Sequence, residues 1–126
     1  MSRNLNDLTE PFRGKAIELL ARLTEANVQV MIVCTGRTQA EQDEAFATAL
    51  SKVRHSRHQD GLAIDICPFN VWQLHGEDKL QWDGKDLVWP KIGVIGEGLG
   101  LRWGGRFQPL NEVGVGWDPG HFEEVS

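Results

Sequence analysis

The segment Leu62–Cys67 constrains the fold of this chain more than any other. It begins directly after the turn signal Asp60-Gly61, and branched apolar side chains alternate in it with small or charged ones. This pattern predicts a β-strand with one face in a core and Asp65 in the middle of the other face. A carboxylate in mid-strand is costly to bury unless a cation or a hydrogen-bond donor pairs with it. The sequence therefore predicts a strand that carries a charged group in need of a partner.

Two stretches flank this strand at a distance with apolar residues at helical spacing. The first begins after Pro11, with Thr9 as its predicted N-cap, and continues for about four turns. The second begins at Pro90 and is expected to stop at the glycines Gly98 and Gly100. Both patterns predict helices that lay one apolar side on a core.

Between the first helix and the Asp65 strand lie two more predicted elements. The run 28–33 is short, β-branched and nearly all apolar, which predicts a strand covered on both faces. The run 39–50 follows a polar cap and predicts a helix, whose inward face is expected to carry Ala45, Phe46 and Leu50. The fold class predicted for residues 1–126 is α+β, a single domain with an antiparallel sheet and helices packed against it.

Composition excludes several kinds of function. The chain of 126 residues has 13 Lys and Arg against 18 Asp and Glu, a net charge of -5, so it lacks the excess cations that bind a nucleic-acid backbone. No apolar run approaches the ~20 residues that a membrane-spanning helix needs, and the N-terminus lacks the apolar stretch of a secretory signal. Cys34 and Cys67 are too few and too far apart for a disulfide scaffold and are expected to be reduced, buried small residues. We expect no nucleic-acid partner, no membrane insertion and a monomer.

Three side chains form a candidate metal site. Two histidines and a carboxylate give a catalytic zinc ion three protein ligands and leave a fourth position for water. His58 precedes Asp65 by seven residues, and the turn at Asp60-Gly61 can bring the two side chains together. His121 is expected to join them from a separate strand near the C-terminus. Asp118 lies three residues before His121, across a Pro-Gly turn, where its carboxylate can act as a general base without being a ligand.

The residues alone leave alternatives open. Arg37 or a backbone donor could pair with Asp65 with no metal present. His55 and His58 could instead form the metal pair, and Asp118 could do no more than cap a turn.

Four segments resemble the motifs of one family. Residues 56–65 resemble the pattern S-x-H-x-x-G-x-A-x-D, and residues 118–123 resemble a second motif with an acidic residue three positions before a histidine. Residues 36–42 resemble G-x-R-[ST]-x-x-x-Q, and residues 98–105 resemble G-L-x-W-G-G. In this order they are similar to the zinc-dependent D-Ala-D-Ala carboxypeptidases and L-alanyl-D-glutamate endopeptidases that cleave peptidoglycan, a family whose fold is shared with hedgehog signalling domains.

The resemblance implies a role for each matching residue. It implies a zinc ion, Zn2+, with the ligands His58, Asp65 and His121. It implies that Asp118 is the catalytic base and that Arg37 orients the substrate, since a guanidinium can hold a peptide carboxylate at two points; a structural salt bridge from Arg37 to Asp65 or Glu41 is the alternative. Ser56 would contact substrate or support a ligand.

The resemblance also implies a reaction. An aspartate at position 118 resembles the endopeptidase branch that contains phage endolysins, so the expected reaction is hydrolysis of the L-Ala-D-Glu amide in the stem peptide of bacterial peptidoglycan. The insert 106–116 departs from the family pattern, and Trp103 and Trp117 are candidates to line the cleft, although core packing is as good an explanation. The alternatives are a D,D-carboxypeptidase and a non-catalytic wall-binding domain. The expected setting is synthesis in the cytoplasm without a signal peptide and action on the cell wall after release, as a lysis enzyme or a virion-attached lysin.

Overall fold

The computed structural model of the chain describes residues 2–48, 56–70 and 75–125. Its centre is a four-stranded antiparallel sheet with the strand order β1-β2-β4-β3. The strands are β1 (Val30–Cys34), β2 (Ala63–Pro68), β3 (Arg102–Trp103) and β4 (His121–Glu123). The α+β fold class predicted from the sequence is confirmed.

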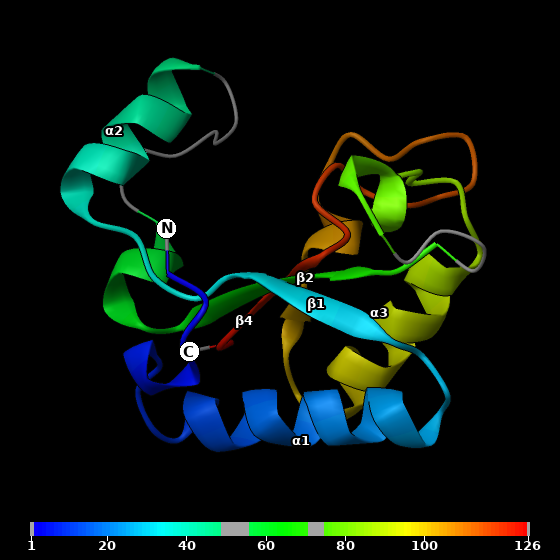
Figure 1. The fold of residues 1–126 in the computed structure, drawn as a ribbon, viewed down its shortest axis with the longest axis horizontal. Helices are drawn as coiled ribbons and strands as arrows, with labels where there is room; N and C mark the ends of the chain where they lie inside the picture. Colours follow the sequence, from blue (N-terminus) through cyan, green and yellow to red (C-terminus); the bar gives the residue numbers. More distant parts are fainter. Residues whose placement is uncertain (1, 49–55, 71–74, 126) are drawn as a thin grey trace.

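Two helices cover one face of this sheet. Helix α1 (Phe12–Glu25) runs along the sheet and contacts α3 (Val88–Gly98), which in turn packs on β3 (Figure 1). The core between helices and sheet is made of fully buried side chains such as Phe12, Ile64 and Phe122. In β2 and β4 the residues that alternate with these core residues face the other side of the sheet, and this is where Asp65 lies.

The ends of both helices differ from the sequence prediction. The N-cap of α1 is Pro11, and no side chain caps it. Thr9 is therefore not the cap; its hydroxyl donates to the carbonyl of Gly61 at 3.2 Å, which ties the start of α1 to the turn before β2. Helix α3 begins at Val88, two residues before Pro90, because a proline fits anywhere in the first turn, where its missing N–H is not needed.

Helix α2 (Gln39–Ala47) stands away from the rest of the fold (Figure 1). The predicted polar cap is present as a capping box between Thr38 and Glu41. Ala45 is buried as predicted, but Phe46 is 37% exposed and does not face a core. Leu50, the third residue expected to face inward, lies outside the described residues.

The first strand is less covered than predicted. It begins at Val30, and its first four residues are only partly buried, whereas the sequence predicted a strand from 28 to 33 with both faces covered. The reason is its position, since β1 is an edge strand of the sheet and the helices cover only one face. Among the described residues, no helix has the length and apolar character required to cross a bilayer.

Candidate metal centre and cleft

The register of the sheet places three chemically active side chains side by side. Asp65 on β2 lies directly opposite His121 on β4, and on its other side it pairs with Cys34 at the end of β1. An irregularity of the β1–β2 pairing between Ile32 and Cys34 accompanies this contact. Because paired residues of antiparallel strands point to the same face, Asp65 and His121 meet without any loop having to deliver them.

His58 reaches the same place from a short 3-10 turn, Arg57–Asp60. Gly61 ends this turn with φ 72°, and a Cβ there would lie 2.7 Å from the carbonyl oxygen of Asp7, so a larger residue would be strained and would clash. The Ser56 hydroxyl accepts a hydrogen bond from the backbone N–H of His58 at 3.1 Å. Ser56 thus caps the turn that presents His58, a contact through the backbone and not through the ring.

Each of the two predicted histidine ligands contacts the Asp65 carboxylate. His58 Nε2 lies 3.1 Å from Asp65 Oδ2, and His121 Nδ1 lies 2.9 Å from Asp65 Oδ1. The two imidazole rings meet edge to face with their centroids 5.2 Å apart. His58 Nε2 is buried and, although it is close to the carboxylate, it has no aligned hydrogen-bond partner among the residues that the structure describes. A buried ring nitrogen aimed at a carboxylate without a hydrogen bond is a donor available to a cation.

These contacts control the charges of the cluster. Burial alone would lower the pKa of His58, but the Asp65 carboxylate and the Cys34 thiol beside it raise this pKa to about 9. Burial acts in the same direction on His121, and hydrogen bonds with Asp65 and Glu123 raise its pKa to about 10. Burial would raise the pKa of Asp65, yet the two histidines outweigh it and hold this pKa far below its usual range. A bound cation would displace the protons from both rings.

Asp118 lies beside this cluster at the edge of the cleft. Its Oδ2 is 3.8 Å from His121 Nδ1, and a cation could be shared by Asp65, Asp118 and His121, whose donor atoms lie within 4.8 Å of one another. The backbone of Asp118 packs against Gly104 so closely that a Cβ there would overlap the Asp118 carbonyl oxygen. Burial, with the negative charge of Asp65 as the next cause, raises the pKa of Asp118 to about 6. A carboxylate with a pKa near neutrality suits proton transfer.

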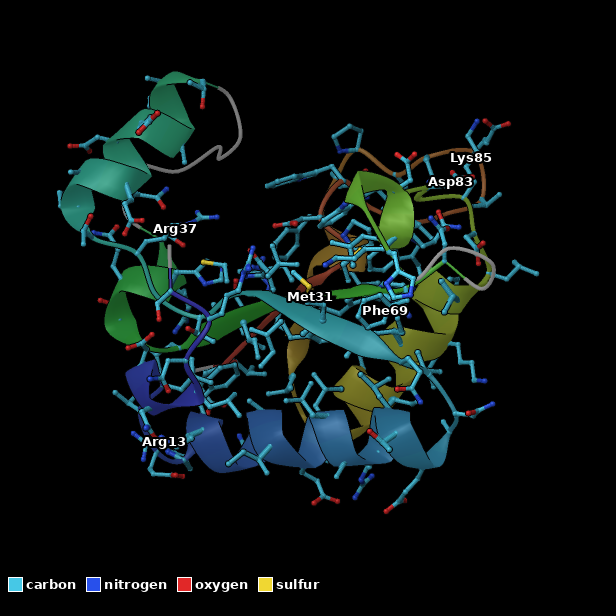
Figure 2. All side chains as sticks on the ribbon, in the orientation of Figure 1. Arg13, Met31, Arg37, Phe69, Asp83 and Lys85 are labelled. Atoms are coloured by element: carbon cyan, nitrogen blue, oxygen red, sulfur yellow. The ribbon has the colours of Figure 1, made fainter. Side chains whose placement is uncertain are left out.

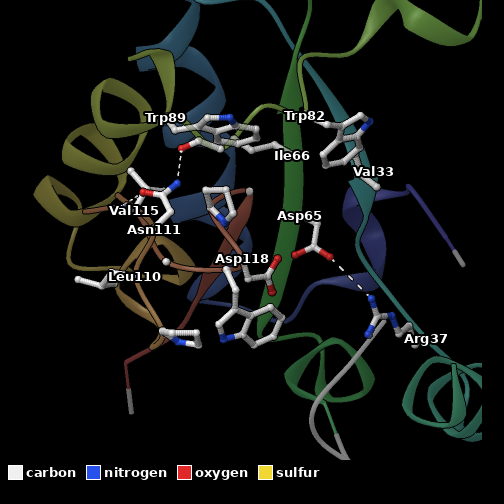
Figure 3. Close-up of a pocket in the computed structure, with 16 residues that line it drawn as sticks. Val33, Arg37, Asp65, Ile66, Trp82, Trp89, Leu110, Asn111, Val115 and Asp118 are labelled. Carbon is white, nitrogen blue, oxygen red and sulfur yellow. Dashed lines mark hydrogen bonds and ion pairs between the residues drawn. The ribbon is translucent and has the colours of Figure 1, made fainter. Parts of the chain in front are cut away.

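Arg37 lies where the chain passes from β1 into α2 and points its guanidinium toward the cluster (Figures 2 and 3). Nη2 is 3.8 Å from Asp65 Oδ2, and Nη1 donates to Gln42 Oε1 at 3.0 Å. Gln42 is fully buried and holds the guanidinium in place from α2. The structure therefore contains the salt bridge between Arg37 and Asp65 that the sequence analysis gave as an alternative. At 3.8 Å this contact is long, and the guanidinium also lines the cleft.

A cleft of about 620 Å³ opens beside Asp65, Asp118 and Arg37 (Figure 3). Trp117, a candidate cleft residue from the sequence, lines this cleft and is 38% exposed. Trp103 does not line it; this residue is 3% exposed because its ring packs against the backbone of two glycines in the core. Several residues of the insert 106–116 form one wall of the cleft, namely Pro109, Leu110, Asn111 and Val115.

Sequence reasoning missed three residues near the site. Trp82, which is 60% exposed and lines the cleft, comes from a polar loop with no periodic signal. Cys34 Sγ lies 3.7 Å from His58 Nδ1. A lone cysteine at the end of a strand gives no sequence signal for a contact with a histidine. Glu123 Oε1 lies 2.9 Å from His121 Nε2. The last could have been found, because residues two apart on a strand share a face.

The donor set fits a metal ion. His58 Nε2, Asp65 and His121 Nδ1 offer two nitrogens and a carboxylate, the donors that zinc takes in sites with an open position. Among the described residues, two groups have all their donor atoms within 4.8 Å of one another: one is Cys34, His58 and Asp65, and the other is Asp65, Asp118 and His121. The two histidines thus belong to different groups, which share Asp65. The alternative histidine of the sequence analysis, His55, lies outside the described residues. The four predicted residues His58, Asp65, Asp118 and His121 are thus together in space, and their roles stay predictions.

Comparison with known proteins agrees with this geometry. Residues 49–124 match the M15 peptidase family described as D-alanyl-D-alanine carboxypeptidase. The crystal structure of the Serratia marcescens L-Ala D-Glu endopeptidase ChiX is similar in fold, with a TM-score of 0.70 and 22% identity over 97% of this chain and 84% of that chain. The LD-carboxypeptidase LdcB is similar with a TM-score of 0.59 and 16% identity over 94% of this chain and 59% of that chain. Among curated protein sequences, none matches.

Proposed function

Because this chain belongs to the M15 peptidase family, we propose that it is a zinc-dependent peptidoglycan endopeptidase that hydrolyses the L-Ala-D-Glu amide of the stem peptide. The observation that carries the proposal is the meeting of His58, Asp65 and His121 at one end of the sheet, with Asp118 at the edge of the adjoining cleft. The similarity in fold to the endopeptidase ChiX supports the choice of bond.

His58, Asp65 and His121 would hold the zinc ion. When bound, zinc supplies a Lewis acid that polarises the scissile carbonyl and lowers the pKa of water. Each histidine would offer the ring nitrogen that faces Asp65, His58 at one carboxylate oxygen and His121 at the other. Cys34 faces the opposite nitrogen of His58, at 3.7 Å from Nδ1, and would support that ring in the proposed ligand set.

Asp118 would move the proton. Its carboxylate faces the cleft beside the ligands, where it can accept a proton from the attacking water and deliver it to the leaving amine. The pKa of about 6 keeps the group ionised at neutral pH, yet basic enough to take a proton. Burial of the Asp118 backbone against Gly104 limits its movement, which favours a fixed distance to the reacting atoms.

Arg37 would position the substrate. D-Glu in the stem carries a free carboxylate next to the scissile amide, and a guanidinium can hold such a group at two points. Arg37 faces the cleft, and Gln42 fixes its orientation from the buried side. The apolar wall with Leu110 and Trp117 lies along the same cleft and would exclude water from the remaining part of the substrate.

The test is digestion of purified peptidoglycan followed by mass spectrometry of the products. Cleavage at L-Ala-D-Glu releases stem peptides with a new N-terminal D-Glu, and removal of zinc with a chelator should abolish this release until zinc is restored. Lysis that continues at full rate in chelator would contradict the zinc-dependent mechanism.

The second candidate is a D,D-carboxypeptidase, which the description of the matching family favours. It would release single D-Ala residues and leave the stem attached to the glycan, so the same digest separates the two activities. A non-catalytic wall-binding domain would release neither product and would keep its binding when Asp118 is replaced by alanine.

We extend the proposal to the setting in which the enzyme acts, lysis of a bacterial cell by a monomeric enzyme after release to the wall. Expression in a bacterial host with and without a membrane-permeabilising protein tests it. The culture should lyse only when the membrane is opened, and lysis should require Asp118. Light scattering of the purified chain should give the mass of one copy, 14.1 kDa.

A further inference from the structure

Each of the two ring nitrogens that face away from Asp65 has a partner. His58 Nδ1 lies 3.7 Å from Cys34 Sγ, and His121 Nε2 lies 2.9 Å from Glu123 Oε1. An imidazole binds a metal through one nitrogen only, and the hydrogen bond at its other nitrogen decides which one is free. The contact of His121 is the stronger of the two, since a carboxylate is a far better acceptor than a thiol.

The position of Glu123 on β4 holds its carboxylate beside His121. It follows His121 by two positions on β4, so both side chains lie on the face of the sheet that carries Asp65. The Glu123 side chain is only 8% exposed, and its second oxygen is held by Arg57 Nε at 3.1 Å and by Arg102 Nη1 at 3.5 Å. A carboxylate with two arginines on one oxygen and a histidine on the other has little freedom to rotate.

Both arginines connect Glu123 to elements that build the metal centre. Arg57 begins the turn that presents His58, and Arg102 lies opposite Glu123 on β3. The carboxylate therefore joins the turn that carries one histidine to the strand that carries the other. The distance between these two histidines depends in part on this link.

We propose that Glu123 is a positioning residue for the metal centre, an inference that rests on the proposed zinc dependence. Its carboxylate accepts the Nε2–H of His121, and this holds the ring in the tautomer and orientation that direct Nδ1 to the ion. Glu123 is not itself a ligand, because it contacts the nitrogen on the side of the ring opposite Asp65, and it belongs to neither group of metal donors found among the described residues.

The test compares zinc affinity in three variants. Glu123→Ala removes the acceptor and should weaken zinc binding by about 10- to 100-fold, as loss of a hydrogen-bond partner of a metal-bound histidine does. Glu123→Gln keeps an acceptor oxygen of the same shape and should restore part of this loss. The matched control is Glu124→Gln, since Glu124 is equally buried and paired, at 2.8 Å with Lys15, but does not contact the histidines.

Dissociation constants come from competition with a chelator, and the visible spectrum of the Co2+-loaded protein reports the ligand geometry. Glu123→Ala should change this spectrum, and Glu124→Gln should leave both spectrum and affinity unchanged. If Glu123→Ala destabilises the fold, the measurement is made on Glu123→Gln, whose affinity should still fall by severalfold. Affinities within twofold of the unmodified protein in both Glu123 variants would overturn the inference. If the unmodified chain bound no zinc, the proposed function would fail instead.

Discussion

Stability of the chelated protein should fall as the pH rises from 6.5 to 9. His58 has its pKa raised from 6.5 to about 9 in the folded protein, and His121 has its pKa raised to about 10. A histidine with a raised pKa stabilises the fold fully below its unfolded value and loses this contribution as the pH rises through the folded value. Asp118, with its pKa raised to about 6, adds to the same trend at lower pH.

The magnitude follows from the size of the shift. For His58, the difference between 6.5 and about 9 corresponds to about 3 kcal/mol of unfolding free energy, at about 1.4 kcal/mol per unit. His121 pairs with the same carboxylate, so its contribution overlaps with that of His58 and is not simply added. We expect a decline of at least about 3 kcal/mol, most of it between pH 7 and pH 9.

Urea unfolding in the presence of chelator measures this decline at a series of pH values. The variant His58→Asn should make the decline smaller, with His121 left to contribute, and His75→Gln, which changes an exposed histidine of a loop, should leave the decline unchanged. With zinc saturating, the trend reverses, because the ion binds deprotonated rings and competes less with protons at higher pH. A chelated protein with constant or rising stability from pH 6.5 to 9 would refute the charge assignment of the cluster.

Three substitutions test single parts of the site. Asp118→Asn should lower kcat for peptidoglycan by about 10²- to 10⁴-fold and leave zinc affinity unchanged. The control Glu112→Gln, which removes an exposed carboxylate in the 106–116 insert, should change neither kcat nor zinc affinity. Arg37→Ala should raise KM by about tenfold or more for a stem peptide with a free D-Glu carboxylate, and an equal change for its amidated form would contradict the pairing. Gly61→Ala should lower stability in urea by more than Gly76→Ala, because both glycines have positive φ but only a Cβ at Gly61 meets backbone atoms.

The sequence was informative where the site depends on local geometry. The pairing of His58 with Asp65 follows from seven residues and a turn, and the structure has both side chains within 3.1 Å. Alternation also placed Asp65 on the face away from the core. It did not predict that His121 lies opposite Asp65, because a period of two fixes the face of a residue and not the register between strands.

Other parts of the cleft had no local signal at all. Trp82 and Leu110 line it from loops whose paths depend on tertiary packing, so no periodicity marks them. Trp103 was a candidate for the cleft from the sequence, with core packing as an equally good explanation, and the structure places it in the core. Gly93 in α3 and Gly105 leave room for its ring there, and the first of these is distant from Trp103 in the sequence.

The charges of the cluster explain how the site can be buried both without a metal ion and with zinc bound. With metal removed, two protonated histidines, His58 and His121, balance the carboxylates of Asp65 and Asp118. One zinc ion brings the same two positive charges to neutral rings, so exchange of two protons for zinc leaves the net charge unchanged. Glu123 adds a further negative charge, which two arginines and His121 meet. Removal of Asp65 would therefore disturb both histidines and the charge balance, whereas Glu123 contacts only one of the proposed ligands, and its replacement by glutamine is the sharper probe of how the ion is held.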